Sequence, residues 1–133
     1  FERICFKNLE SVAKVANIKC MFSAHWWKDF DNKDSKEIDI LLNRDDETLT
    51  IIEIKFYKAP LNFSEISKDL EDKKTSLQLY LDNFRDIKTT KRNKAKKINI
   101  ITISVEGITV TKQSQQKEIY LSVSKNIKLE EII

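Results

Sequence analysis

The stretch from Lys36 to Phe56 decides the fold, and it reads KEIDILLNRDDETLTIIEIKF. Apolar side chains alternate at a period of two on either side of the charged segment 44–48, which predicts two strands joined by a hairpin of ordinary length. One phase of the alternation contains Ile38, Ile40, Leu42, Ile52, Ile54 and Phe56. The other phase contains Asp39, Leu41, Asn43, Leu49, Ile51, Glu53 and Lys55.

The register of this hairpin brings two acidic residues together. The opposed pairs are Asn43 with Leu49, Leu41 with Ile51, and Asp39 with Glu53. Opposed Cβ atoms lie about 4.5–5.5 Å apart in an antiparallel pair, and Lys55 points to the same face as Glu53. The first phase is wholly apolar and predicts core. The second phase is apolar near the turn and becomes charged toward the open end of the hairpin.

Two neighbouring carboxylates repel each other, and burying them is costly unless a cation compensates. Mg²⁺ is a natural compensator, because it binds one or two carboxylates together with phosphate oxygens of a substrate. A lysine beside such a site can hold a phosphate or orient a water molecule. The spacing therefore suggests a centre that cleaves phosphodiester bonds. A surface charge cluster on a half-exposed sheet explains the spacing equally well, but both strands are otherwise apolar on both faces, which favours the site.

The remaining segments predict a mixed sheet with helices packed on it. In chain order we expect a helix over 1–16, a strand over 18–27, the hairpin, a long helix after Pro60, strands over 98–105, 108–111 and 118–124, and a last short helix over 127–133. Asn62 and Glu65 resemble a capping box at the start of the long helix. The apolar face of that helix contains Ile66, Leu70, Leu77, Leu81 and Phe84. Gly107 marks a turn, and Asn126 can cap the last helix.

Composition bounds the class of protein. The chain has 133 residues, 41% of them hydrophobic and 34% charged, which is typical of one globular domain. No apolar run approaches the roughly 20 residues of a membrane span, and no signal peptide opens the sequence. The net charge of +3 permits an anionic partner without demanding one. Cys5 and Cys20 lack zinc-site spacing, so we expect two reduced thiols and a cytoplasmic location.

The hairpin carries a resemblance to a known family. Ile38-Asp39, followed after the turn by Ile52-Glu53-Ile54-Lys55, resembles the core motif of the PD-(D/E)XK nuclease superfamily, whose common core has the order αβββαβ. With Phe1-Glu2 upstream and Ile100-Ile101-Thr102 downstream, nearly the whole chain is similar to the nuclease-like C-terminal domain of bacterial and archaeal P-loop ATP-binding proteins. The resemblance implies a restriction-endonuclease-like α/β (α+β) domain over 1–133. It also implies an N-terminal ATPase domain in a longer parent chain, which would explain a sequence that starts with Phe inside a predicted helix.

The resemblance also implies roles for individual residues. Asp39 and Glu53 would bind the metal ion, Mg²⁺ or Mn²⁺, and the Ile54 carbonyl would complete the coordination by the protein. Lys55 would position the attacking water and stabilise charge on the phosphate. Glu2 resembles an acidic ligand that several branches place in the first helix, although a glutamate favourable to the helix dipole explains it equally well.

Further basic residues are candidates for nucleic-acid contacts. The second helix of the family often supplies a Gln or Lys, and Lys73 and Lys74 are both available here. Lys91 and Arg92 lie in a basic connector over 88–97 that could bind phosphates, although charge runs in loops are more often merely solvated. His25 is the only histidine, and its apolar neighbours favour a structural or edge-strand role.

These observations leave two functions open. The first is a Mg²⁺-dependent deoxyribonuclease, a hydrolase with DNA, or RNA, as its substrate. The second is a catalytically inactive nuclease-like module that binds nucleic acid or packs on the ATPase domain, since a fold does not settle activity. No Gly-rich phosphate loop occurs in the chain, so any ATP must bind elsewhere in the parent protein. The oligomeric state is left open by the sequence.

Overall fold

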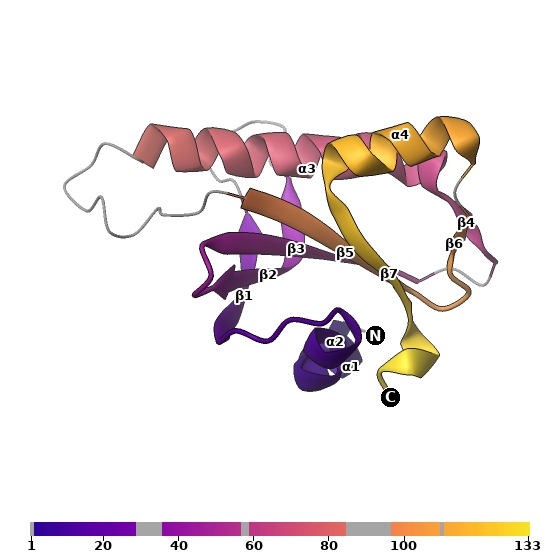
Figure 1. Cartoon of the computed structure of the whole chain (residues 1–133), viewed down its shortest axis with the longest axis horizontal. Coiled ribbons are helices and arrows are strands. Elements are labelled where there is room, and N and C mark those ends of the chain that lie inside the picture. Colours follow the sequence, from indigo (N-terminus) through magenta and orange to yellow (C-terminus); the bar gives the residue numbers. More distant parts are fainter. Residues whose placement is uncertain (1, 29–35, 57–58, 85–96, 110) are drawn as a thin grey trace.

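A five-stranded sheet lies between two layers of helices in the computed structural model, which describes residues 2–28, 36–56, 59–84, 97–109 and 111–133 (Figure 1). The helices, in chain order, are α1 (Glu2–Lys7), α2 (Leu9–Val15), α3 (Phe63–Phe84), α4 (Lys112–Leu121) and the 3₁₀ turn η1 (Leu129–Glu131). The strands are β1 (Phe22–Lys28), β2 (Glu37–Arg44), β3 (Thr48–Lys55), β4 (Leu61–Asn62), β5 (Lys97–Ser104), β6 (Ile108–Thr109) and β7 (Val123–Lys128). The predicted mixed α/β architecture is therefore confirmed.

The hairpin forms where the alternation places it. Strand β2 pairs antiparallel with β3, and Asn43 is opposite Leu49 and Leu41 opposite Ile51, as predicted. The sheet has the order β1-β2-β3-β5-β7. Strand β5 runs parallel to β3, and β7 runs parallel to β5. Because β3 joins the antiparallel half of the sheet to its parallel half, it is a central strand with neighbours on both sides.

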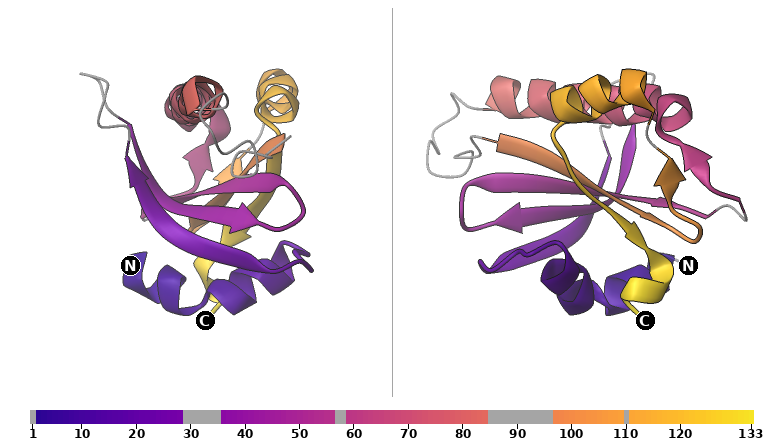
Figure 2. Two further views of the ribbon diagram at one scale, coloured as in Figure 1. Left: turned by 90° about the vertical axis from the view of Figure 1, so that its left-hand side faces the viewer. Right: turned by 45° about the vertical axis from the view of Figure 1, so that its right-hand side comes forward.

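Both faces of the sheet are buried, which explains why both phases of the hairpin are rich in apolar residues. Helices α3 and α4 cover one face, and α1 and α2 cover the other (Figures 1 and 2). The core under α3 includes Leu41, Leu49, Ile51, Ile66, Leu70, Leu77, Ile100 and Leu121. The core above α1 and α2 includes Cys5, Val12, Ile40, Leu42, Ile52, Ile101, Ile103 and Ile127. Each residue of β3 can therefore face a packed layer.

Helix α3 follows the sequence signals closely. The Asn62 side-chain oxygen accepts a hydrogen bond from the Ser64 amide at 3.2 Å, which satisfies one of the free N–H groups at the start of the helix. The predicted apolar face is buried at Ile66, Leu70, Leu77 and Leu81. The side chain of Phe84 lies outside the described residues. Burial of this stripe fixes which way the rest of the helix faces.

The N-terminal prediction needs correction. The expected helix over 1–16 is two helices, α1 and α2, which separate at Asn8. The Asn8 side-chain amide donates to the Ile4 carbonyl at 2.7 Å, and such a local bond competes with the helical ladder. The following strand starts at Phe22 rather than at residue 18. His25 is exposed on β1, an edge strand of the sheet, as expected.

The C-terminal prediction is wrong in two places. The segment 118–124 is not one strand, because α4 continues to Leu121 and β7 begins at Val123. Ser122 between them has a φ of 57°, which a helix or a strand does not allow. Asn126 lies inside β7 and caps no helix, and the expected helix over 127–133 is only the short turn η1.

Two smaller differences remain. The predicted strand over 108–111 is β6, which pairs in parallel with β4 in a separate two-stranded sheet. Phe56, expected in the core, follows the end of β3 and is 62% exposed.

Neither cysteine is in a disulfide bond; Cys5 is buried and Cys20 is partly buried. No helix in the described ranges has the length and apolar character that crossing a membrane requires.

Candidate active site

A β-bulge in β2 shapes the open end of the hairpin. His25 of β1 is opposite Leu41, and Trp27 is opposite Ile38, so Trp26 alone lies opposite both Asp39 and Ile40. An extra residue in one strand shifts the side chains beyond it to the other face. Ile38 therefore packs in the core under α3 with Leu41, not on the face of Ile40 as the simple alternation predicts. Bulges are common next to active sites.

Near the bulge, Asp39 pairs with a backbone amide of β3 and not with Glu53. The regular ladder between β2 and β3 ends at the pair Ile40–Ile52, one position before the predicted Asp39–Glu53 pair. The Asp39 carboxylate instead accepts a hydrogen bond from the Ile54 amide, with N to Oδ2 at 3.0 Å. The Ile54 N–H would otherwise donate to a backbone carbonyl of β2 if the ladder continued, and here it donates to the Asp39 side chain instead. Asp39 thus remains at the end of β3 and is only partly buried.

Glu53 is the most deeply buried charged residue of the hairpin. It lies on β3 in the layer under α3, and its side chain is 1% exposed. Lys73 of α3 donates a hydrogen bond to Glu53, with Nζ to Oε2 at 2.7 Å. The other carboxylate oxygen, Oε1, is buried and has no hydrogen-bond partner. A buried acceptor without a partner is costly, and in a native structure it commonly marks a place for a proton, a water molecule or an ion.

Two lysines and two carboxylates form a closed cycle around this position, which we call the charge ring. It consists of Glu53, Lys55, Asp69 and Lys73. Lys55 Nζ lies 3.6 Å from Glu53 Oε2 and 3.3 Å from Asp69 Oδ2. Lys73 Nζ lies 2.7 Å from Glu53 Oε2 and 3.4 Å from Asp69 Oδ2. Each charge therefore has two neighbours of opposite sign, and the charge ring has no net charge when all four groups are ionised.

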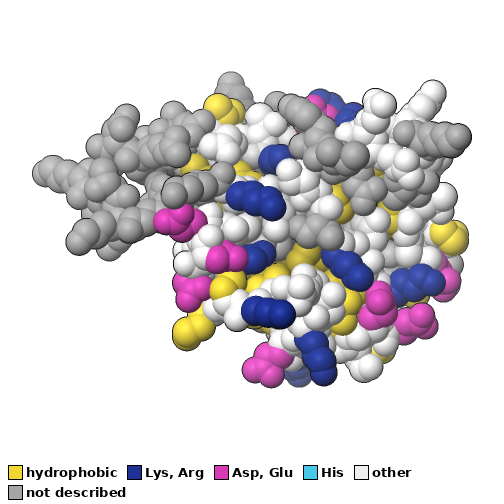
Figure 3. Space-filling view, in the orientation of Figure 1, with side chains coloured by type: hydrophobic (Ala, Val, Ile, Leu, Met, Phe, Trp, Pro, Cys, Tyr) yellow, Lys and Arg dark blue, Asp and Glu magenta, His cyan; other side chains and the backbone are white. Residues whose placement is uncertain are grey.

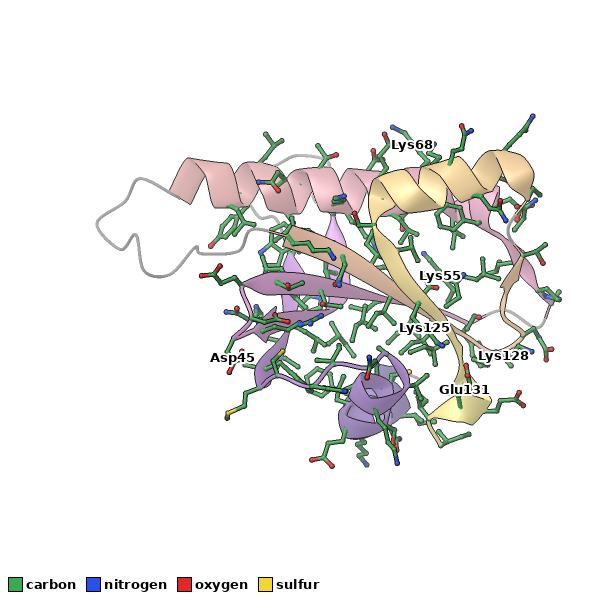
Figure 4. The ribbon with its side chains drawn as sticks, in the orientation of Figure 1. Asp45, Lys55, Lys68, Lys125, Lys128 and Glu131 are labelled. Atoms are coloured by element: carbon green, nitrogen blue, oxygen red, sulfur yellow. The ribbon has the colours of Figure 1, made fainter. Side chains whose placement is uncertain are left out.

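The charge ring connects the sheet to the helix above it. Figure 4 shows Lys55 below α3, on the side of the sheet that this helix covers, whereas Lys68 lies on the outer side of the helix. Lys36 approaches from the start of β2, with Nζ 3.7 Å from Asp69 and 3.8 Å from Asp72. Three lysines thus surround one carboxylate of α3.

Burial and charge set the protonation of these groups. Burial raises the pKa of Glu53 from its ordinary value of 4.5 to about 7, because the opposing attraction of Lys73 is too weak and the charge of Asp39 adds repulsion. The pKa of Lys73 is raised, because the attraction of Glu53 outweighs the effect of burial. Burial works to raise the pKa of Asp69, but Lys73 and Lys55 outweigh it and hold that pKa below 3.8. Glu53 is therefore the member that changes its protonation near neutral pH.

The structure separates the two lysines that the sequence left open. Lys73 faces the sheet and belongs to the charge ring, whereas its neighbour Lys74 does not. Lys74 lines a separate hollow of about 280 Å³ with Leu79 and Leu121, and burial lowers its pKa. The predicted contacts of both lysines with nucleic acid remain predictions. Lys91 and Arg92 lie outside the described residues.

The surface in Figure 3 carries Lys, Arg, Asp and Glu side chains interspersed over the face of β7 and η1. The described basic residues of this face do not form one continuous patch there. Positive and negative side chains therefore lie close together among the described residues of this face.

Two carboxylates of this site match the donors that a hard cation prefers. Glu53 Oε1 is a buried oxygen without a partner, and Asp39 is near enough to repel Glu53. Mg²⁺ needs only one or two carboxylates when water and phosphate oxygens complete its shell, so the residues fit such an ion. Among the described side chains, however, no group of three or more His, Cys, Asp or Glu residues could enclose a metal ion. Glu2 begins α1, but its side chain lies outside the described part of the chain.

Asp69 and Lys36 were not anticipated from the sequence. A signal for the helix side of the site was nevertheless present in α3. Its buried stripe runs Ile66, Leu70, Leu77, and Lys73 lies three residues after Leu70 and four before Leu77, where helical spacing calls for an apolar residue. A charged residue in a buried stripe requires a partner, and Asp69 lies one turn earlier on the same side.

Comparisons of the chain with protein-family models, with curated proteins and with solved structures found no match. The function must therefore be inferred from the site itself and from the resemblance of the hairpin motif.

Proposed function

We propose that this chain is a metal-dependent nuclease-like domain that hydrolyses phosphodiester bonds of DNA, and that a P-loop ATPase module precedes it in a longer protein. The resemblance of Asp39, Glu53 and Lys55 to the PD-(D/E)XK motif supports the reaction class. The order of one helical segment, three antiparallel strands, a long helix and a parallel strand supports the restriction-endonuclease-like topology. The attachment to an ATPase rests on the resemblance alone.

The observation that carries the proposal is the unpartnered oxygen of a buried carboxylate next to a second carboxylate and a lysine. Glu53 Oε1 is buried without a hydrogen bond, and Lys55 is 3.6 Å from Glu53. The Asp39 carboxylate is held by the Ile54 amide, and its charge acts on Glu53. A proton, a water molecule or a cation would satisfy this oxygen of Glu53. We assign it to a cation because the charge of Asp39 also acts on Glu53.

Each residue has a distinct task in this proposal. Asp39 and Glu53 hold Mg²⁺ or Mn²⁺, and the Ile54 carbonyl is a further candidate ligand. A divalent cation supplies Lewis acidity toward the phosphate and makes water more acidic. Lys55 binds a phosphate oxygen and stabilises the charge that develops on it. Lys73 offsets part of the charge of Glu53, and a bound cation would offset the repulsion between Glu53 and Asp39.

The catalytically inactive module remains the second candidate, and one distance favours it. Lys73 Nζ is only 2.7 Å from Glu53 Oε2, so an ammonium group already supplies the cation that the buried carboxylate needs. A domain of this kind would bind nucleic acid or pack on the ATPase module without cleaving its ligand. The same site residues would then serve stability alone.

A cleavage assay separates the two candidates. Wild-type protein, Asp39→Asn and Lys55→Ala are incubated with plasmid DNA, linear DNA and RNA in Mg²⁺ or Mn²⁺. Lys68→Ala serves as the matched control, because its ammonium group is on the outer side of α3 with a side chain that is 78% exposed. We expect cleavage by wild type and by Lys68→Ala, and its loss in the two site variants. Absence of cleavage by wild type with either metal, together with equal DNA affinity in all variants, would favour the inactive module.

Metal binding has a simpler readout. An ion that binds only the folded site raises the melting temperature as its concentration rises. We expect Mg²⁺ to stabilise the wild type and not Asp39→Asn. Equal stabilisation of both proteins would place any bound ion away from Asp39.

A further inference from the structure

Asp69 closes the charge ring from the helix side. Its Oδ2 atom accepts a hydrogen bond from Lys55 at 3.3 Å and lies 3.4 Å from Lys73. Its Oδ1 atom lies 3.7 Å from Lys36. One carboxylate on α3 thus contacts the ammonium groups of three lysines, two of which come from the hairpin. Among the described residues, it is the direct polar contact between α3 and Lys55.

Lys55 requires such a contact to occupy one position. Its side chain has four methylene groups and many rotamers, and fixing it has an entropic cost. Glu53, on the same strand, restrains the ammonium group from below at 3.6 Å, beyond hydrogen-bond distance. Asp69 restrains it from α3 at a distance that allows a hydrogen bond. Because the ammonium group has three N–H donors, fixing two directions also fixes the third.

Asp69 is itself rigidly held. Its side chain is short, and the neighbouring Leu70 is fully buried in the core under α3, so the backbone at this point of the helix is fixed by packing. The side chain of Asp69 is 35% exposed, whereas that of Lys55 is 19% exposed. Asp69 is therefore the more exposed partner of a pair whose lysine is mostly buried.

We propose that Asp69 is a positioning residue that fixes the Lys55 ammonium group in the orientation needed to bind the phosphate of the substrate. This inference rests on the proposed function, in which Lys55 contacts the phosphate. It adds a residue from α3 that the PD-(D/E)XK motif in the hairpin does not include. Asp69 acts through Lys55 and does not touch the reacting atoms.

The test compares Asp69→Asn with a matched control, Asp72→Asn. Asp72 lies on the same helix with nearly the same exposure, 34%, and it pairs with Lys36 and Lys68 but not with Lys55. Three quantities are measured for each variant of the 133-residue chain: kcat and KM for cleavage of linear DNA, and the order parameter of the Lys55 ammonium group from ¹⁵N relaxation. Melting temperatures establish that both variants are folded.

We expect Asp69→Asn to lower the order parameter of Lys55 and to reduce kcat about 10- to 100-fold, the scale of misplaced catalytic groups, while KM stays equal or falls. Asp72→Asn should leave all three quantities near the wild-type values. An unchanged order parameter in Asp69→Asn would overturn the inference. So would a higher kcat with tighter binding of DNA, because Asp69 would then occupy the place of a phosphate.

The two proposals can fail separately. Absence of cleavage by wild type contradicts the proposed nuclease function, but the order parameter of Lys55 is measured without substrate or metal. Lower order in Asp69→Asn alone would still support the positioning contact, and equal order in both variants would contradict it.

Discussion

Replacing Glu53 with glutamine should remove a large pH dependence from the stability of this protein. Glutamine has nearly the shape of a glutamic acid side chain and cannot ionise, so it imitates the protonated form of Glu53 at every pH. The side chain is 1% exposed, and water therefore screens its charge very little. The difference in stability between the variant and the wild type isolates the ionisation of this one group.

The size of the effect follows from the pKa of Glu53. Its ordinary value of 4.5 applies to the unfolded chain, and burial raises it to about 7 in the folded protein. Between these two values the folded state holds a proton that the unfolded state has lost, so the free energy of unfolding falls as pH rises. A difference of about 2.5 at about 1.4 kcal/mol per pKa unit gives about 3 kcal/mol. Asp46 and Asp69, whose pKa values lie below 3.8, change protonation below this window.

Urea denaturation at several pH values from 4.5 to 8, with a chelator present, measures the effect. Glu53→Gln and wild type should have similar free energies of unfolding at pH 4.5. At pH 8 the variant should be more stable by about 3 kcal/mol, because only the wild type has lost its proton there. Glu37→Gln is the control, since Glu37 is on the same hairpin with a side chain 54% exposed in a surface ion pair with Lys28, and such pairs contribute little.

The reasoning about the buried carboxylate fails if Glu53→Gln keeps the wild-type dependence on pH. It fails equally if the variant is less stable than wild type at pH 8, because Glu53 would then gain more from its lysine partners than burial costs it. Adding Mg²⁺ to wild type at pH 8 should recover part of the lost stability if the proposed metal site exists, and it should not change Glu53→Gln.

Four further substitutions can be checked by the same denaturation measurements. Lys73→Met leaves Glu53 without its closest cation, so we expect a loss of about 3 kcal/mol at pH 8 and a much smaller loss at pH 4.5, where Glu53 is protonated. Leu70→Ala opens a cavity under α3 and should cost about 2–5 kcal/mol, whereas Leu79→Ala, at a residue 56% exposed, should change stability by less than about 0.5 kcal/mol. Gly107→Ala should cost about 1 kcal/mol or more, because Gly107 has a φ of +87° that alanine rarely adopts; an equal stability would contradict the strained backbone.

The hairpin was predictable because its signals are local. The two alternating stretches and the charged turn between them give the strands and their register near Asn43 and Leu49, and both were confirmed. The long helix was predictable for the same reason, since Asn62 and the stripe through Leu70 mark its start and its buried face. Local patterns of this kind need no knowledge of the rest of the chain.

The bulge at Asp39 was not predictable from the hairpin alone. The bulge arises from the pairing of β2 with β1, where Trp26 lies opposite two residues of β2. No pattern within 36–56 predicts that β1 pairs with the outer edge of β2. The prediction that Asp39 is directly opposite Glu53 was therefore wrong, because the regular pairing ends one position earlier, at Ile40 and Ile52. Their closeness was still anticipated, because both lie at the same end of the hairpin.

The strand expected over 98–105 was confirmed as β5, but the segment 112–133 was predicted poorly because its signals conflict. The segment 112–121 has few apolar residues, and Ile119, Tyr120 and Leu121 in succession favour a strand by composition. The chain is nevertheless helical up to Leu121. Strand β7 was then missed because it reads VSKNIK, with polar residues that pair in the sheet; the Thr102 hydroxyl, for example, donates to the side chain of Asn126. Tertiary pairing outweighs local propensity here.

The closed form of the charge ring has a consequence for divergence among related sequences. A substitution at Lys55, Asp69 or Lys73 leaves two neighbours of the same sign facing each other, so single replacements there are penalised more than paired ones. Glu53 is the exception, because its ionised form is costly when buried and an uncharged residue of the same shape can replace it alone. Related proteins that have lost this activity should therefore lack one acidic and one basic residue of the charge ring together, with apolar residues at both positions. An isolated exchange at Lys55, Asp69 or Lys73, with the other three members of the charge ring kept, should be rare among close kin.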